Sequence, residues 1–152
     1  MLQVYKRMQK MREKYVDTLA KLYEYATTVY SKKQYTQWYD TKKGGYTYAS
    51  LKERCDSLSK VLTQYGIGAG DKVAILSQSM PNWSVAFFSL APYGRIVIPI
   101  LPDSSTNEVT NIINHSETKA IFVSQKLAGK ISQEVKEKMV LIIDVDTLEI
   151  IK

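Results

Sequence analysis

Residues 72–100 read KVAILSQSMPNWSVAFFSLAPYGRIVIPI, and this stretch decides the fold class. Two apolar runs of strand length, 73–76 and 96–100, flank a segment over 82–93 whose pattern predicts a helix. Neither run alternates apolar with polar residues, which is typical of strands covered by helices on both faces. The stretch therefore predicts two strands of a parallel sheet joined through a helix.

The same alternation of elements continues toward the C-terminus. Ser105 stands three residues before Glu108, the spacing of a capping box at the start of a helix. The remaining elements are expected in chain order as that helix to about residue 115, a strand over 120–123, a polar helix over 126–138 and a strand over 140–143. The expected fold class is α/β, with a parallel-type sheet of about four strands and helices on both faces.

Two helices are expected before this sheet. The first covers about residues 3–30, where apolar side chains recur at steps of three and four: Met8, Met11, Tyr15, Leu19, Leu22, Ala26 and Val29. Thr47 is the expected N-cap of the second, which ends at Gly66. Its buried stripe is predicted to hold Leu51, Cys55, Leu58, Leu62 and Tyr65. We divide the chain into a basic N-terminal helix and turn, 1–45, and an α/β segment, 46–152.

The net charge of +6 lies entirely in the first 45 residues, which hold 10 basic and 4 acidic side chains against 11 of each in the remainder. With 152 residues, 45% of them hydrophobic, the chain can form a core, which excludes a disordered protein. The basic front is either a solvated helix flank or an interfacial helix for an anionic membrane. It carries Lys6, Arg7, Lys10, Arg12 and Lys14. Nucleic-acid binding is not expected, because no stacking platform accompanies the basic residues.

Cysteine and histidine each occur once, as Cys55 and His115. Neither an intrachain disulfide nor a Cys/His zinc cluster can therefore form, and a reducing, cytoplasmic location is expected. The most apolar stretch, 83–101, is interrupted by proline, glycine and arginine, so we predict no membrane-spanning helix. No secretory signal is expected either, since no apolar signal core follows the basic residues at the N-terminus.

The glycine loop, the single cysteine and the single histidine could each carry chemistry, and the sequence favours a structural interpretation of all three. The glycine loop at Gly66, Gly68 and Gly70 follows a helix and precedes a strand, which is the reverse of the order in a phosphate-binding loop. Cys55 falls on an apolar helical stripe and His115 near a helix end, so neither predicts a nucleophilic site.

Ligands of open parallel sheets bind at the carboxyl ends of the strands. Those ends are expected at 77–82, 101–105, 124–125 and 144–146. They are polar, but they hold no lysine or arginine before Lys126 and no glycine, which is a poor complement for a nucleoside triphosphate. Asp144 and Asp146 are interpreted as turn residues rather than metal ligands. We therefore predict no catalytic, cofactor-binding or metal-binding residue in this chain.

Several short motifs follow one another at informative spacings. They are Asp17-Thr18-Leu19, Thr47-Tyr48 with Leu51, Gly66-Ile67, Gly70-Asp71 with the strand that follows, Pro81-Asn82-Trp83, Ile98-Pro99-Ile100-Leu101-Pro102-Asp103, Glu108-Val109, and the segments 112–117 and 119–124. In this order they resemble the N-terminal part of the AMP-forming acyl-CoA synthetase superfamily, and most of all its long-chain fatty-acid CoA ligases. The resemblance spans about residues 17–144.

The resemblance implies an enzyme that joins a fatty acid to AMP, releases pyrophosphate and transfers the acyl group to CoA. For the full-length enzyme it implies ATP, Mg and CoA. The family's phosphate loop, adenylate pocket and catalytic lysine match nothing in these residues, so the resemblance implies an incomplete large domain that is inactive by itself. The alternative is a stand-alone interaction or regulatory module; a domain with uncovered apolar surface would self-associate. Arg95 departs from the family, which prefers a small residue after Gly94.

Overall fold

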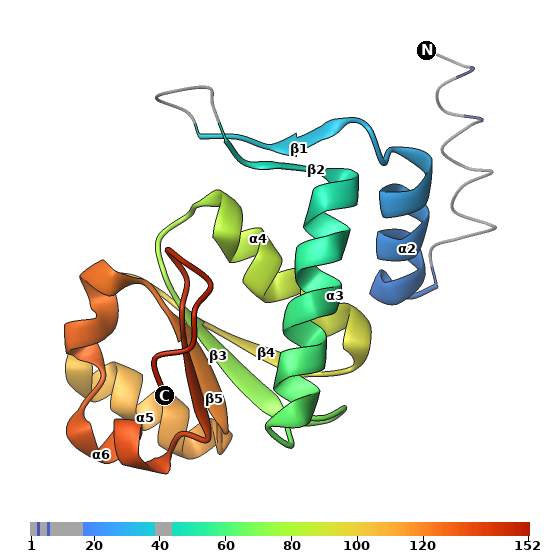
Figure 1. The fold of residues 1–152 in the computed structure, drawn as a ribbon. Helices are drawn as coiled ribbons and strands as arrows, with labels where there is room; N and C mark the ends of the chain where they lie inside the picture. Colours follow the sequence, from blue (N-terminus) through green and yellow to red (C-terminus); the bar gives the residue numbers. More distant parts are fainter. Residues whose placement is uncertain (1–2, 4–5, 7–16, 39–43) are drawn as a thin grey trace.

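The computed structural model describes residues 3, 6, 17–38 and 44–152 (Figure 1). Its elements are α2 (Leu19–Val29), β1 (Gln34–Thr36), β2 (Tyr46–Thr47), α3 (Tyr48–Gln64), β3 (Lys72–Leu76), α4 (Pro81–Phe88), the 3-10 turn η1 (Ala91–Tyr93), β4 (Ile96–Ile100), α5 (Thr106–Ser116), β5 (Ala120–Val123), the 3-10 turn η2 (Gln125–Lys130), α6 (Gln133–Lys138) and β6 (Leu141–Asp144). No helix of the described part combines the length and apolar content that crossing a membrane requires.

A parallel sheet of four strands in the order β4-β3-β5-β6 forms the centre of the fold. Val73 lies opposite Val97 on one side and Ala120 on the other, so β3 is paired along both edges. The expected α/β fold with a parallel sheet of about four strands is confirmed.

Helices cover both faces of this sheet, as predicted. Val73 and Ile75 face a core shared with α3 and α4, while Ala74 and Leu76 face a second core shared with α5 and α6. In Figure 1 the central strands run between α3 on one side and α5 and α6 on the other. All four of these β3 side chains are fully buried, because successive strand residues point to opposite faces and each face is covered.

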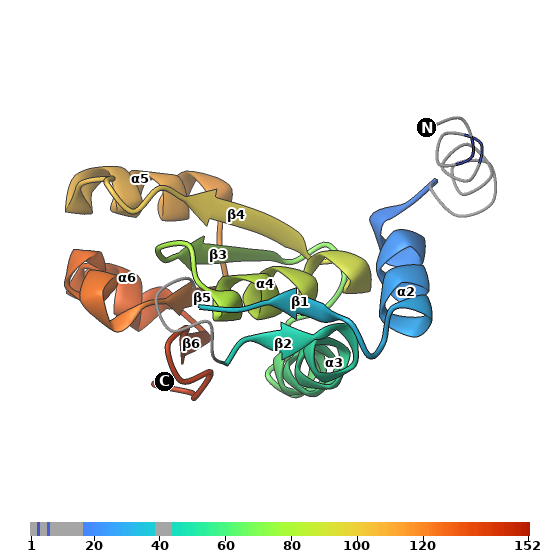
Figure 2. The same ribbon diagram turned by 90° about the horizontal axis from the view of Figure 1, so that it is seen from above.

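An antiparallel pair, β1 with β2, precedes α3 and was not predicted from the sequence. It places Tyr35 and Tyr46 against the first core. Helix α2 packs on α3 at the same end, and Figure 2 shows α2 and α6 at opposite ends of the molecule.

Three predicted helices differ from the observed ones. Helix α2 begins at Leu19, because the Thr18 side chain accepts a hydrogen bond from the Lys21 amide and caps the helix there. The rest of the helix predicted over 3–30 falls largely outside the described residues. The helix predicted over 82–93 divides into α4 and η1. The helix predicted over 126–138 is interrupted at Ile131, which is extended and buried (3% exposed), so that α6 starts only after a new cap at Ser132.

The capping predictions are confirmed at two helices. Thr47 and Ser50 form a reciprocal capping box at the start of α3, and Ser105 and Glu108 form one at α5. Tyr65 is an exception to the predicted α3 stripe, since it follows the last helical residue and is 44% exposed.

Gly66 ends α3 in the way the sequence indicates. Its φ of 74° lies in the left-handed region. The Gly66 amide donates to the Thr63 carbonyl at 3.0 Å, and the Ile67 amide donates to the Leu62 carbonyl at 2.9 Å, which together make a Schellman motif. Ile67 and Leu62 are both fully buried, so the turn also fixes where the chain enters the core.

Arg95, which precedes β4, is buried with only 5% of its surface exposed. Its guanidinium makes five hydrogen bonds: to the Ile67 carbonyl at 3.0 Å, the Ser59 hydroxyl at 2.8 Å, the Ser59 carbonyl at 3.0 Å, the Thr63 hydroxyl at 2.8 Å and the Ser89 carbonyl at 3.4 Å. Burial lowers the pKa of this side chain because the charged form loses hydration. The Arg95 side chain, which departs from the family pattern, thus links α3, the glycine loop and the end of α4.

The two edges of the sheet differ. The outer edge of β6 pairs with the C-terminal residues: the Ile142 amide donates to the Lys152 carbonyl at 2.9 Å, and the Asp144 amide to the Glu149 carbonyl at 2.8 Å. At the other edge, the Ile96 amide donates toward β3, to the Asp71 carbonyl. Backbone amides alternate in direction along a strand, so the backbone nitrogen of Pro99 faces away from β3. Proline has no amide hydrogen, so this edge lacks one donor without any loss to the ladder.

We expect Arg95→Ala to lower the free energy of unfolding by about 2–4 kcal/mol, because it leaves buried carbonyl groups without a donor. Urea denaturation measures the change. Arg54→Ala is the matched control, since Arg54 is exposed on α3 and its removal should cost less than about 0.5 kcal/mol. Equal losses in the two variants would contradict the role assigned to Arg95.

Candidate functional site

The carboxyl edge of the sheet brings together the polar segments that follow β3, β4, β5 and β6. Ser124, after β5, donates from its hydroxyl to the Gln78 side chain at 3.2 Å and from its amide to the Leu76 carbonyl at 3.1 Å. Ser77 and Ser124 are both buried. The ends of β3 and β5 are therefore joined by side chains as well as by the ladder.

Asp144 and Asp146 bind the start of η2. The carboxylate of Asp146 accepts the Gln125 amide at 2.7 Å, and that of Asp144 accepts the Gln125 side chain at 2.6 Å and the Asp146 amide at 2.7 Å. These are turn contacts, as the structural interpretation of the two aspartates expects. No group of three or more potential metal ligands occurs among residues 17–38 and 44–152.

Asn82, in the first turn of α4, links three parts of the chain. Its Oδ1 accepts the Tyr46 hydroxyl at 2.5 Å, and its Nδ2 donates to the carbonyls of Val145 at 2.7 Å and Asp146 at 3.0 Å. Tyr46 belongs to β2, so this carboxamide connects the antiparallel pair, α4 and the end of β6.

The loop after β4 is bound by Lys130. Its ammonium donates to the Pro102 carbonyl at 2.6 Å and to the Ser104 carbonyl at 2.8 Å. This cation lies near the sheet edge, yet it is occupied by backbone carbonyl groups rather than presented to a ligand.

These hydrogen bonds define what the edge can do. Its carboxylates, amides and ammonium are hydrogen-bonded within the protein, and among the described residues at this edge no contact joins a nucleophile to a general base. Such an arrangement fixes the loops at the carboxyl ends of the strands.

The other sequence candidates lie elsewhere. Cys55 is fully buried in α3, with its Sγ 3.6 Å from the Val85 carbonyl, and burial raises the pKa of the thiol to about 12. His115 is exposed in the last turn of α5. In the glycine loop, the Gly68 amide donates to the Asp71 carboxylate at 2.8 Å, so its donor is used internally.

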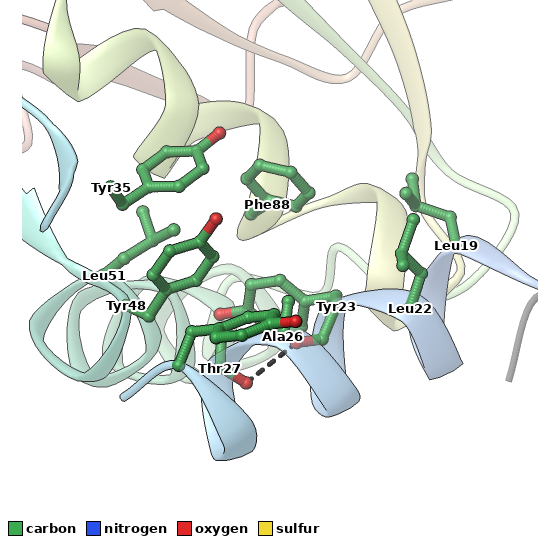
Figure 3. A pocket seen from close by; sticks show the side chains of 10 residues that line it. Leu19, Leu22, Tyr23, Ala26, Thr27, Tyr35, Tyr48, Leu51 and Phe88 are labelled. Atoms are coloured by element: carbon green, nitrogen blue, oxygen red, sulfur yellow. Dashed lines mark hydrogen bonds between the residues drawn. The ribbon is translucent and has the colours of Figure 1, made fainter. Parts of the chain in front are cut away.

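A second candidate site, which sequence reasoning missed, is an apolar pocket of about 310 Å³ between α2 and the opposite residues of β1, α3 and α4 (Figure 3). Its lining residues are Leu19, Leu22, Tyr23, Ala26, Thr27, Tyr30, Tyr35, Tyr48, Leu51 and Phe88. They come from segments far apart in the chain, so no local pattern unites them. The one signal was the abundance of tyrosine, with 11 in 152 residues.

Comparison with known proteins identifies relatives for most of the chain. The family model described as AMP-binding enzyme matches residues 24–151. Fatty acyl-CoA synthetase A of Dictyostelium discoideum is 25% identical over 95 residues, which cover 60% of this chain and 14% of that protein. Long chain acyl-CoA synthetase 2 of Arabidopsis thaliana is 28% identical over 95 residues, with the same two coverages of 60% and 14%. The chain thus spans about a seventh of the length of these relatives.

Solved structures share the fold. The anthranilate CoA ligase AuaEII, in complex with anthranoyl-AMP, superposes with a TM-score of 0.76 at 17% identity, covering 88% of this chain and 25% of that one.

We expect Asn82→Ala to lower the free energy of unfolding by about 1–3 kcal/mol, because the buried Val145 carbonyl and the Tyr46 hydroxyl lose their partner. Asn111→Ala, on the exposed side of α5, is the control and should change stability by less than about 0.5 kcal/mol. Chemical denaturation compares the two; an Asn82→Ala protein as stable as the control would show that this link is dispensable.

The raised pKa of Cys55 makes stability depend on alkaline pH. The folded thiol holds its proton up to about pH 12, against a usual value of 9.0, so its contribution is complete below pH 9 and is lost as the pH rises toward 12. Between pH 9 and 11, Cys55→Ala should lose stability less steeply than the unmodified chain, by up to about 1.4 kcal/mol per pH unit. Urea titrations across this range measure both slopes. Parallel slopes would mean that the thiol titrates alike in the folded and unfolded chains.

Proposed function

This chain belongs to the AMP-binding enzyme family, and from that premise we propose that it supplies the N-terminal part of the large domain of an ATP-dependent long-chain fatty-acid CoA ligase. The match over residues 24–151 carries the proposal. The fatty acyl-CoA and long chain acyl-CoA synthetases among its relatives support the substrate class. The substrates of the whole enzyme would be a fatty acid, ATP and CoA.

The residues described at the carboxyl edge of the sheet and in the glycine loop do not fit ATP or Mg²⁺ as ligands. Asp144 and Asp146 accept hydrogen bonds from η2, Lys130 is occupied by two carbonyl groups, and the Gly68 amide is bound to Asp71. A phosphate or metal site needs donors or carboxylates that are free to turn toward the ligand. No step of the reaction is therefore assigned to these side chains.

The proposed contribution of the chain is positional. Asn82, Gln125 and Lys130 fix the loops at the carboxyl edge of the sheet, which is where open α/β sheets bind ligands. Residues of the same domain that carry phosphate and acyl-adenylate contacts would be placed against this edge. A fixed edge favours catalysis because catalytic donors act only when their geometry is held before reaction.

A stand-alone interaction or regulatory module is the second candidate function. Two observations favour it. A buried core lies on each face of the sheet, and residues 149–152 pair with the outer edge of β6. A module of this kind would fold and act without the nucleotide-binding parts of the family.

The proposal also covers the cellular location of the protein and its contacts with membranes and with other copies of itself. We place the protein in the cytoplasm, supported by its single, buried cysteine. Peripheral membrane contact through residues 1–14 lies largely outside the described residues and stays a prediction, as do self-association through apolar surface and the division of the chain at residue 45.

Purified chain incubated with ATP, Mg²⁺, CoA and palmitate should release no pyrophosphate above the level of a reaction without protein. The reason is that the cation and amides described at the carboxyl edge of the sheet are bound internally, so they cannot stabilise the charge that develops at the α-phosphate of ATP. A coupled pyrophosphate assay measures the rate, and circular dichroism confirms that the protein is folded. Sustained turnover by the 152-residue chain would overturn the positional role.

An antibody raised against α3 (Tyr48–Gln64) separates the two candidate functions. In extracts of the source cells, a polypeptide several times larger than 17.3 kDa would support the ligase. A single polypeptide at that mass would support the module and contradict the ligase.

A further inference from the structure

The pocket bounded by α2 is enclosed almost entirely by apolar atoms. Leu51 and Phe88 lie opposite Ala26 of α2 (Figure 3), and the hydroxyl of Thr27 is turned to the Tyr23 carbonyl at 2.8 Å, so it does not compete for a ligand. Leu19 and Leu22 lie at one end and remain 39% and 37% exposed. A volume of about 310 Å³ is at the small end of the range for organic ligands.

A cation lies beside this apolar pocket. The Lys33 ammonium is 5.0 Å from the centre of the Tyr30 ring, and Tyr30 lines the pocket. Within residues 17–38 and 44–152, no carboxylate comes within ion-pair distance of Lys33. The Tyr30 ring holds this ammonium beside the pocket.

Tyr23 lines the pocket and is itself almost completely buried. Only 7% of the surface of Tyr23 is exposed, and its hydroxyl has no hydrogen-bond partner in the described structure. Its ring stacks on Phe88 with centroids 5.2 Å apart. Buried hydroxyl groups without a partner are uncommon in folded proteins.

We propose that this pocket binds a single-chain anionic amphiphile, with its alkyl chain among the apolar side chains and its anionic head group at Lys33. The apolar lining selects the chain, the Lys33 ammonium selects the sign of the head group, and the small volume excludes lipids with two chains. None of the lining residues belongs to the carboxyl edge of the sheet, so the proposal holds for either candidate function.

The test uses monomeric decanoate, below its micellar concentration, with the intact chain. Isothermal titration should show saturable binding, and the affinity should rise about fourfold for each methylene from hexanoate to decanoate, since each buried methylene contributes about 0.8 kcal/mol. The rise should stop once the chain fills the pocket. Decanol and decyltrimethylammonium should bind at least fivefold more weakly, because neither carries a negative charge.

Two pairs of variants locate the site. Ala26→Phe fills the pocket and should abolish binding, while Val29→Phe, on the 53%-exposed part of the same helix, should leave it unchanged. Lys33→Gln should weaken decanoate binding about fivefold without affecting decanol, while Lys32→Gln should change neither. Circular dichroism checks that each variant is folded.

Nuclear Overhauser effects from the terminal methyl of decanoate to Phe88 and Leu22 in the unmodified chain give a test that needs no variant. Absence of saturable binding, equal binding by Ala26→Phe and Val29→Phe, or equal loss in Lys32→Gln and Lys33→Gln would each overturn the proposal. Binding to phosphatidylglycerol vesicles with none to monomeric decanoate would overturn it too, since it would identify a membrane surface rather than a pocket.

Discussion

The buried guanidinium of Arg95 is the constraint on which the arrangement of the layers depends. Taking a charge out of water is costly, and the cost is offset only where its donors find acceptors of good geometry. Arg95 finds them on Ser59 and Thr63 of α3, on Ile67 of the glycine loop and on Ser89 after α4. Helix α3 can thus occupy only one position relative to the start of β4, and the first core forms around that position.

The carboxyl edge of the sheet also depends on hydrogen bonds between residues far apart in the chain. Asn82 reaches a tyrosine 36 residues before it and carbonyl groups 63 and 64 residues after it. Such contacts join segments far apart in the chain, so they depend on the assembled sheet rather than on local sequence. An edge built in this way presents a fixed frame to whatever binds against it, which suits a domain whose reacting groups come from other segments.

Sequence patterns predicted what is local and missed what is not. The strands from β3 to β6, the caps at Thr47 and Ser105 and the end of α3 at Gly66 follow from apolar runs and cap chemistry, and the family resemblance rested on the same segments. The β1–β2 pair was missed because strands of three and two residues leave no periodicity. The interruption at Ile131 was missed because it results from tertiary burial, and the partners of Arg95 lie up to 36 residues away.

The unequal edges of the sheet bear on how the protein behaves when concentrated. Strand edges with free amides and carbonyls are templates for fibril growth by addition of strands from other molecules. Here the chain's own C-terminal residues occupy the edge at β6, and Pro99 interrupts the row of donors at β4. Neither edge therefore offers an uninterrupted template for strand addition, although Ile96 and Leu101 beside the sheet are exposed.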